Sequence, residues 1–232
     1  KLVKNKVISI KRRSKYLLIN LSGQITIIVH LGMTGKFFIE NSKKKIKKLS
    51  FYYELDNKKK KHDHLIFKFN KNIKLIYNDV RRFGFIKIIK TAEIINISHL
   101  KLLGPEPMSD NFNSKYFINY IINKKRTIKD LLMDQKFVAG LGNIYVNEIL
   151  FLSNIMPQKK IKYISKKSID KLIINTKQIL KKSISLGGSS IKDFKDGTGK
   201  KGNFQHKFKV YGREGSVCAK NKCKSLIKKT YI

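Results

Sequence analysis

The chain has 232 residues, of which 41% are apolar, so a packed core is feasible and wholesale disorder is excluded. Lysine and arginine total 52 against 15 acidic residues, which gives a formal net charge of +37. Nucleic acid is the first candidate partner that could neutralise such a surface, and an anionic membrane is the second. Heavy use of Lys, Ile and Asn is also typical of AT-rich coding sequences, which would explain part of the lysine excess without a partner. No apolar run approaches the roughly 18 residues of a membrane span, and the two cysteines suggest a reducing, cytoplasmic setting.

The first part of the chain predicts β-strands. Within residues 7–40, the β-branched runs YLLINL and QITIIVH flank Ser22-Gly23, a pair typical of hairpin turns. After a lysine-rich, loop-like segment at 41–61, the runs HLIFKF, IKLIYND and FGFIKIIK alternate apolar and polar residues. This alternation predicts antiparallel sheets with one face buried in the core and the other exposed to solvent.

The second part of the chain predicts helices. Two prolines and a glycine in LGPEPMSD (103–110) end the strands, and Ser109 or Asp110 can cap a new helix. Beyond them, apolar residues recur at helical spacing, and Ser165 is placed to cap the strongest segment. The expected helices cover residues 111–123, 127–136 and 166–185, and a later run, KFKVYG, is typical of a strand.

The stretch AGLGNIYVNE breaks a helical pattern and then restarts it. Two glycines flank Leu141, and Asn143 follows as the expected cap of a helix that begins at Ile144. The first amide N–H groups of such a helix have no intrahelical partner and can hold a phosphate. An ordinary corner between two core helices explains the same spacing, so both interpretations stay open.

Two further stretches place unusual side chains at strand ends. In HLGMTG, Met33 lies between two glycines, and in NDVRRFGF, Arg81 and Phe83 alternate and therefore share a face. An arginine beside an aromatic ring can fill a gap in a base stack and hydrogen-bond an unpaired base. The alternative is burial of Met33 and Phe83 in the core, where both residue types are common.

Other candidate residues are less informative. Lys15 is the basic residue nearest to an apolar run, where partial burial would lower its pKa and suit proton transfer, but the residues alone favour a solvated strand start. His62 and His64 are expected on one strand face, with no third metal ligand nearby in the sequence. Cys218 and Cys223 supply only half of the four ligands that a structural zinc site needs.

In order and spacing, these stretches resemble the formamidopyrimidine-DNA glycosylase family, whose members excise 8-oxoguanine and ring-opened purines. The shared motifs are RRSKYLL, HLGMTG, KHDH, RRFG, LGPEPMSD, IKDLLMDQKFVAGLGNIYVNE, GGSSIKDF and VYGREG, which together run along nearly the whole chain. The resemblance implies an α+β fold with three parts. These are a two-layered antiparallel β-sandwich over 1–102, a helical helix–two-turns–helix domain over 103–197, and an incomplete zinc finger over 198–232.

The resemblance also implies roles in chemistry and base flipping. Lys15 matches a lysine that donates a proton in β-elimination and touches a phosphate. Met33, Arg81 and Phe83 match three side chains that enter the duplex where the damaged nucleotide leaves. The loop at 189–204 resembles one that closes over the flipped base.

Further positions match the family's contacts with its partner, which is double-stranded DNA containing oxidised purines. His62, Arg81 and Lys124 match DNA-contacting positions, and Lys129 and Asn143 match phosphate contacts of the helical domain. The break before Asn143 is thus similar to a turn that clamps the DNA backbone beside the lesion. The family resemblance further implies a monomer without membrane association.

The sequence departs from the family pattern at both ends. The family's nucleophile is an N-terminal proline in a Pro-Glu-Leu-Pro-Glu opening, which is absent here, so we expect residues 1–232 alone to be inactive. Cys218 and Cys223 match one half of a site that holds one zinc per chain in the family. Their spacing is longer than usual, and the second pair of cysteines is absent.

Several functions therefore stay open. The first is a base-excision repair glycosylase with AP-lyase activity that removes oxidised purines by base flipping and Schiff-base chemistry. A decayed or truncated protein that binds damaged DNA without cutting it would use the same sites. An endonuclease VIII-like glycosylase for oxidised pyrimidines fits the Met/Arg/Phe set less well, and a basic RNA-binding protein rests on charge alone.

Overall fold

The protein is described by a computed structural model, which covers residues 2–40, 46–48, 60–189 and 202–230. Most of the lysine-rich segment 41–61 lies outside the described residues. The same holds for most of the loop 189–204, which we expected to close over a base.

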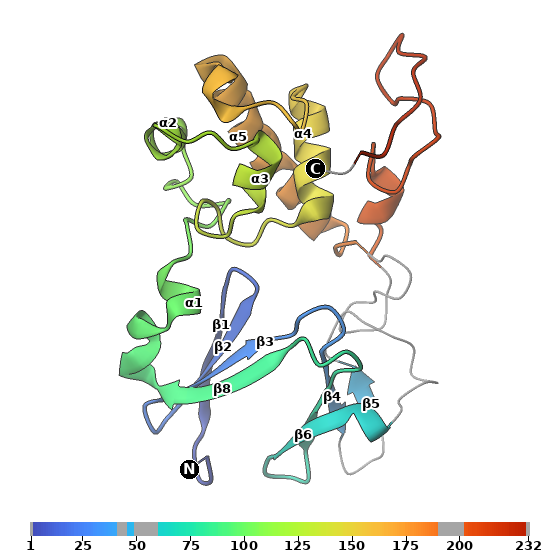
Figure 1. Ribbon diagram of the computed structural model, residues 1–232. Coiled ribbons are helices and arrows are strands. Elements are labelled where there is room, and N and C mark those ends of the chain that lie inside the picture. Colours follow the sequence, from blue (N-terminus) through green and yellow to red (C-terminus); the bar gives the residue numbers. More distant parts are fainter. Residues whose placement is uncertain (1, 41–45, 49–59, 190–201, 231–232) are drawn as a thin grey trace. The chain divides into compact units, whose positions relative to one another are not determined.

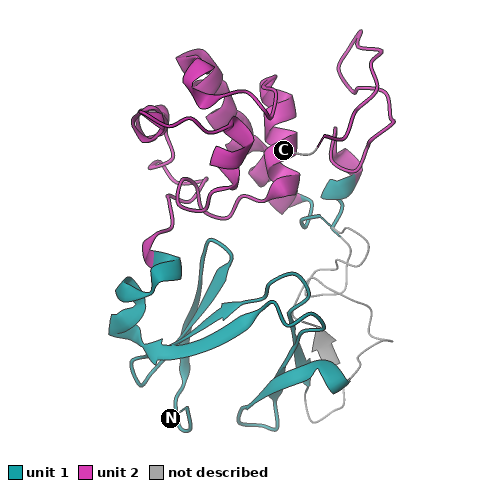
Figure 2. Cartoon of the chain, in the orientation of Figure 1, with its two compact units in different colours: residues 1–100, 186–205 teal, residues 101–185, 206–232 magenta. Residues whose placement is uncertain are grey.

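The chain divides into two compact units, each built from two stretches of sequence (Figure 2). Unit 1 comprises residues 1–100 and 186–205, and unit 2 comprises residues 101–185 and 206–232. The segment that follows the longest helix thus returns to unit 1 before the chain ends in unit 2.

Unit 1 contains two four-stranded antiparallel sheets (Figure 1). The first sheet has the order β1-β2-β3-β8, with β1 at Val7–Arg13, β2 at Tyr16–Leu21, β3 at Ile25–His30 and β8 at Phe85–Lys90. The second has the order β5-β4-β7-β6, with β5 at Ile46–Lys48, β4 at Lys36–Glu40, β7 at Lys74–Asn78 and β6 at Asp63–Lys68. The short helices η3 (Thr91–Asn96) and α1 (Ser98–Lys101) follow β8. The predicted antiparallel sheets are confirmed.

The two sheets pack face to face because apolar residues alternate along their strands. Ile19 of β2 pairs with Ile27 of β3, and both join Val29 in one buried cluster. Phe37 and Tyr77 enter the same cluster from the second sheet. Burial of each large apolar side chain contributes about 1.5–3 kcal/mol, so this shared core holds the two layers together.

Unit 2 is helical. Its helices are α2 at Ser114–Ile121, α3 at Ile128–Met133, α4 at Asn143–Ser153, η4 at Ile161–Tyr163 and α5 at Lys166–Ser185. The short helix η5 (Phe204–Lys207) begins in residues assigned to unit 1 and ends in residues assigned to unit 2. The α5 helix matches the predicted range 166–185, and Ser165 Oγ accepts a hydrogen bond from Ser168 N at 3.3 Å, as expected of a cap. Within the described part of the chain, every helix is too short or too polar to cross a bilayer.

The start of α2 differs from the prediction. Asn113 caps this helix through Oδ1, which accepts a hydrogen bond from Tyr116 N at 2.9 Å. The expected caps, Ser109 and Asp110, belong to the preceding turn, where the Ser109 hydroxyl donates to Glu106 O at 2.8 Å. Several cap-type residues lie close together here, and the bend after the prolines decides which one meets the free amides.

The prediction of a strand at KFKVYG is wrong. Residues 207–212 are all described and form no strand. Their amides are taken by Glu148 of α4, whose carboxylate accepts hydrogen bonds from Lys209 N, Val210 N and Tyr211 N at 2.7, 2.9 and 2.8 Å. Glu148 is buried, so this contact ties the segment after η5 to α4 in place of a β-ladder.

Candidate nucleic-acid interface

Three exposed side chains from two separate turns of unit 1 meet at one place. Met33 lies in the turn between β3 and β4, and Arg81 and Phe83 lie in the loop between β7 and β8. Arg81 Nη1 is 3.4 Å from Met33 Sδ, and Arg81 Cζ is 4.4 Å from the centre of the Phe83 ring. Met33 is 58% exposed and Phe83 is 57% exposed, which excludes the core alternative for both.

Glycines let the two turns approach closely. Gly32 has φ +60°, and a Cβ there would lie 2.7 Å from the carbonyl carbon of Phe83. A Cβ on Gly84 would lie 2.6 Å from His30 O. Side chains at either position would force the turns apart, so both glycines are needed for the contact between Met33 and Arg81.

Beneath these side chains lies Asp79, a fully buried residue that our sequence reasoning missed. Its carboxylate accepts hydrogen bonds from the Thr34 hydroxyl, from Tyr77 OH at 3.0 Å, from Gly84 N at 2.9 Å and from Arg81 N at 3.3 Å. Burial raises the pKa of Asp79, but these hydrogen bonds together outweigh burial and hold the pKa below its ordinary value. The signal in the sequence is a single acid, separated by Val80 from two consecutive arginines, in a strongly basic chain.

Lys15 lies in the turn between β1 and β2, directly before β2 begins at Tyr16. Its side chain reaches solvent, yet surrounding protein atoms displace part of the water around the ammonium and lower its pKa.

Burial also lowers the pKa of His30, and the charges of Lys15 and His99 lower it further. Gly32 N donates to His30 Nδ1 at 3.2 Å, so the neutral imidazole carries its proton on Nε2. His30 is a second candidate that sequence reasoning missed.

His62 and His64 do not share a strand face. His62 lies in the short helix η2 (Lys60–His62), whereas His64 belongs to β6. His64 Nε2 lies 2.8 Å from the carbonyl oxygen of Asp79, so this ring supports the loop that carries Arg81. The short helix breaks the alternation on which the prediction depended.

In unit 2, the turn between α3 and α4 is held by one side chain. Gln135 Oε1 accepts from Gly140 N at 2.7 Å, and Gln135 Nε2 donates to Leu141 O at 2.9 Å. Gly142 is the N-cap of α4, so the predicted cap, Asn143, is instead the first helical residue. Asn143 is exposed at this helix N-terminus, with Oδ1 bonded to Asn147 Nδ2 at 3.0 Å.

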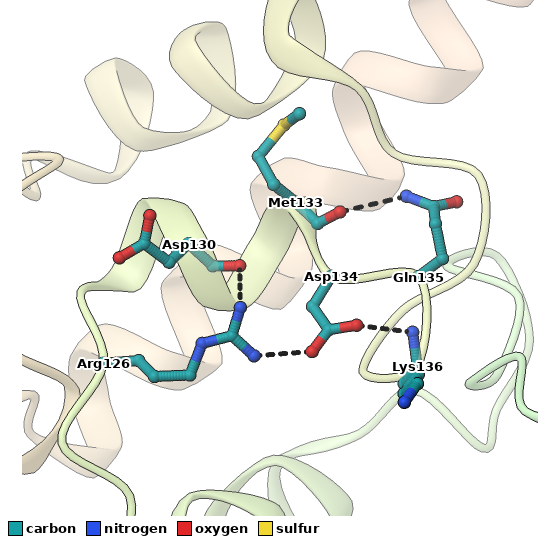
Figure 3. A pocket seen from close by; sticks show the side chains of 6 residues that line it. All are labelled: Arg126, Asp130, Met133, Asp134, Gln135 and Lys136. Atoms are coloured by element: carbon teal, nitrogen blue, oxygen red, sulfur yellow. Dashed lines mark hydrogen bonds and ion pairs between the residues drawn. The ribbon is translucent and has the colours of Figure 1, made fainter. Parts of the chain in front are cut away.

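An open pocket of about 810 Å³ lies beside this turn (Figure 3). Arg126 Nη1 contacts Asp134 Oδ2 at 2.5 Å, and Arg126 Nη2 donates to Asp130 O at 3.0 Å. Burial raises the pKa of Asp134, but hydrogen bonds from Arg126 and from Lys136 N outweigh this and lower the pKa overall. The network braces the turn after α3, which leads to the N-terminus of α4. Lining the pocket are Arg126, Asp130, Met133, Asp134, Gln135 and Lys136.

Lys129, a predicted phosphate contact, and Lys124, a predicted DNA contact, also lie in unit 2. Lys129 is half-buried in the first turn of α3, where its backbone N–H donates to Pro157 O at 3.3 Å. Lys124 Nζ lies 3.8 Å from the centre of the Tyr120 ring and donates to Tyr120 O. The ammonium of Lys124 is thus drawn toward α2, a contact that the sequence did not indicate.

Cys218 and Cys223 have free thiols that lie next to each other. The pKa of Cys223 lies below its ordinary value, first because Ser225 N donates to its sulfur and next because of the Cys218 thiol. No group of three or more His, Cys, Asp or Glu residues that could hold a metal occurs among the described residues. Two thiolates leave a tetrahedral zinc site half complete, so the described residues do not by themselves fit the ion.

Taken together, these elements define a two-unit α+β protein in which an antiparallel β-sandwich is combined with a braced helix–turn–helix element. Residues 1–86 match the model of the formamidopyrimidine-DNA glycosylase N-terminal domain, and residues 103–195 match that of the formamidopyrimidine-DNA glycosylase H2TH domain. The chain belongs to the formamidopyrimidine-DNA glycosylase family.

Individual relatives agree with this assignment. The chain is 38% identical to formamidopyrimidine-DNA glycosylase from Roseobacter denitrificans, with 99% of this chain and 79% of the relative covered. It is 40% identical to that from Rickettsia bellii, with 99% and 78% covered. Among solved structures, the Lactococcus lactis Fpg in complex with DNA containing an abasic site superposes with a TM-score of 0.83 at 35% identity, covering all of this chain and 79% of that one. A complex of the same protein with DNA containing N7-benzyl-Fapy-dG has the same TM-score at 36% identity, again with all of this chain and 79% of that one covered.

Proposed function

We propose that this chain acts in base-excision repair as a DNA glycosylase with AP-lyase activity. Its substrate is duplex DNA containing oxidised purines, namely 8-oxoguanine and formamidopyrimidines, and it acts by base flipping and Schiff-base chemistry. The family's nucleophile for this chemistry, an N-terminal proline, is not among residues 1–232, which by themselves are expected to bind the lesion without excising the base. The observation that carries the proposal is the meeting of Met33, Arg81 and Phe83 at the tips of two turns. Relatives named formamidopyrimidine-DNA glycosylase, and a related Fpg bound to lesion-containing DNA, support it.

The three side chains suit insertion into a base stack. Extruding a nucleotide costs a few kcal/mol of unstacking, and apolar or aromatic groups that fill the gap offset part of that cost. Phe83 offers a ring for stacking and Met33 a polarisable sulfur, while Arg81 offers donors to the base that has lost its partner. Lesion recognition then depends on these side chains, whereas intact DNA is held by charge alone.

Other groups of the two units suit the sugar and phosphates of DNA. A lowered pKa brings Lys15 closer to the range in which it can exchange a proton, in keeping with a proton donor in β-elimination. The Nε2–H of neutral His30 suits a phosphate oxygen. In unit 2, Asn143 and the first amides of α4, with Lys129, suit the DNA backbone. We also propose His62 and Lys124 as DNA contacts.

Cys218 and Cys223 are proposed as two ligands of a structural zinc ion, the role that the family resemblance implies. Such an ion would order the segment around the two thiols and would take no part in the chemistry at the sugar. No step of the proposed mechanism depends on it.

The proposal predicts that the chain prefers damaged duplex. We expect it to bind a duplex with a tetrahydrofuran abasic-site analogue at least about tenfold more tightly than the intact duplex, because no paired base must be unstacked. Fluorescence anisotropy at fixed ionic strength measures both affinities. Equal affinities would contradict the repair function, and incision of an 8-oxoguanine duplex separates an enzyme from a protein that only binds damage.

A second prediction concerns Lys129. Replacing it with alanine should weaken binding to damaged and intact duplex alike and reduce the slope of log K against log salt by about 1, because one phosphate contact is lost. Lys171→Ala, which removes an exposed lysine of α5, is the matched control and should leave the slope unchanged. Identical slopes for both variants and the unmodified protein would show that Lys129 does not contact a DNA phosphate.

A further inference from the structure

One hydroxyl joins the two turns that carry the exposed side chains. Thr34 follows Met33 in the first turn and is buried. Its Oγ1 donates to Asp79 Oδ1 and accepts a hydrogen bond from Arg81 N at 3.0 Å. A single side chain therefore links the Met33 turn to the backbone of the Arg81 loop.

The carboxylate of Asp79 extends this link to the far end of the loop. Oδ2 accepts from Gly84 N at 2.9 Å and from Tyr77 OH at 3.0 Å. Asp79 is fully buried, so its charge depends on these protein donors. Losing one donor leaves a buried charge poorly compensated, and the loop must shift to restore the balance.

We propose that Thr34 and Asp79 are positioning residues for lesion recognition, which hold Met33, Arg81 and Phe83 in the arrangement that enters the duplex. Both are buried, and they act through the backbone of the two turns rather than by contact with DNA. A preorganised set of side chains pays less entropy on insertion than a mobile one. The inference rests on the proposed function, because it assumes that these three side chains enter the base stack.

A purely structural role for Thr34 is the alternative, and unit 1 offers a matched control. Thr26 of β3 is also buried, and its Oγ1 donates to Asn20 Oδ1 at 2.8 Å and lies 3.0 Å from Thr91 Oγ1. Changing either threonine to valine removes the same hydroxyl while keeping the side-chain shape. Only Thr34 touches the loop that carries Arg81.

The test compares Thr34→Val, Thr34→Ser and Thr26→Val with the unmodified chain. Fluorescence anisotropy gives the dissociation constants for intact duplex and for duplex with a tetrahydrofuran abasic-site analogue, and the ratio of the first to the second measures the lesion preference. Circular dichroism gives the midpoint of thermal unfolding. We expect Thr34→Val to lower this ratio about tenfold, because one buried hydrogen bond to a charged group is lost. Thr34→Ser should keep the ratio within about twofold because it retains the hydroxyl. Thr26→Val should leave the ratio unchanged even where it lowers the thermal midpoint.

The outcomes separate the inference from the proposed function. An unmodified chain without lesion preference would refute the function itself. A preference that survives Thr34→Val, or that falls equally in Thr26→Val, would refute only the positioning role. If Thr34→Val does not fold, Tyr77→Phe removes another donor to Asp79 and should lower the ratio about threefold, and an unchanged ratio would overturn the inference.

Discussion

Replacing Arg81 with alanine is expected to weaken binding to a duplex with a tetrahydrofuran abasic-site analogue by about 10- to 100-fold, while affinity for intact duplex falls by about threefold or less. A charge-assisted hydrogen bond to an unpaired base contributes about 1.5–3 kcal/mol, and this contact is available only where a base has lost its partner. The guanidinium also packs on the Phe83 ring and against Met33 Sδ, so its removal loosens both neighbours.

The measurement is anisotropy titration of both duplexes, with 2-aminopurine fluorescence opposite the lesion as a readout of insertion. Lys68→Ala is the matched control, because it removes one positive charge from an exposed position in unit 1, on β6. It should change both affinities only slightly. Equal losses on damaged and intact duplex in Arg81→Ala would show that Arg81 acts as a general charge and does not enter the base stack.

Replacing Glu148 with alanine is expected to lower the free energy of unfolding by roughly 3–5 kcal/mol, because three hydrogen bonds to a charged group, each worth about 1.5–3 kcal/mol, are lost. Its buried carboxylate accepts three backbone hydrogen bonds, and truncation leaves the amides of Lys209, Val210 and Tyr211 without that acceptor. A folded domain is stable by only about 5–15 kcal/mol, so this change removes a large fraction of the total.

Urea unfolding followed by circular dichroism measures the loss, and hydrogen exchange should show faster exchange at residues 209–211. Glu214→Ala removes the same charge from an exposed position in the same unit and should change stability by less than about 0.5 kcal/mol. If the two variants unfolded at the same urea concentration, the segment after η5 would not depend on Glu148.

Much of the secondary structure followed from local pattern. The alternation of apolar residues predicted the antiparallel strands, and the stripe along residues 166–185 predicted α5 with Ser165 as its cap. These signals are strong because each strand or helix buries one face, and burial enforces the spacing along the chain. Family-like motifs also marked Met33, Arg81 and Phe83 as candidates before any contact among them was visible.

Errors arose wherever a distant group competed with local propensity. KFKVYG has the composition of a strand, but Glu148, some sixty residues earlier, takes its amides. Asn143 was predicted as a cap, but Gly142 precedes it with extended backbone and takes that position. Asp79 and Gln135 were overlooked because each matters through hydrogen-bond partners that only the fold supplies.

By itself, the sequence determined most of the segments that form strands or helices, the strong positive charge and the family to which the chain is similar. These properties depend on composition and on spacing between near neighbours. Only the tertiary structure decided that Met33 and Phe83 are exposed and that Arg81 lies between them. That arrangement depends on Thr34 and Asp79, which are 45 positions apart. Hydrogen bonds across such a separation form only after β4 has paired with β7, so no local pattern in the chain predicts them.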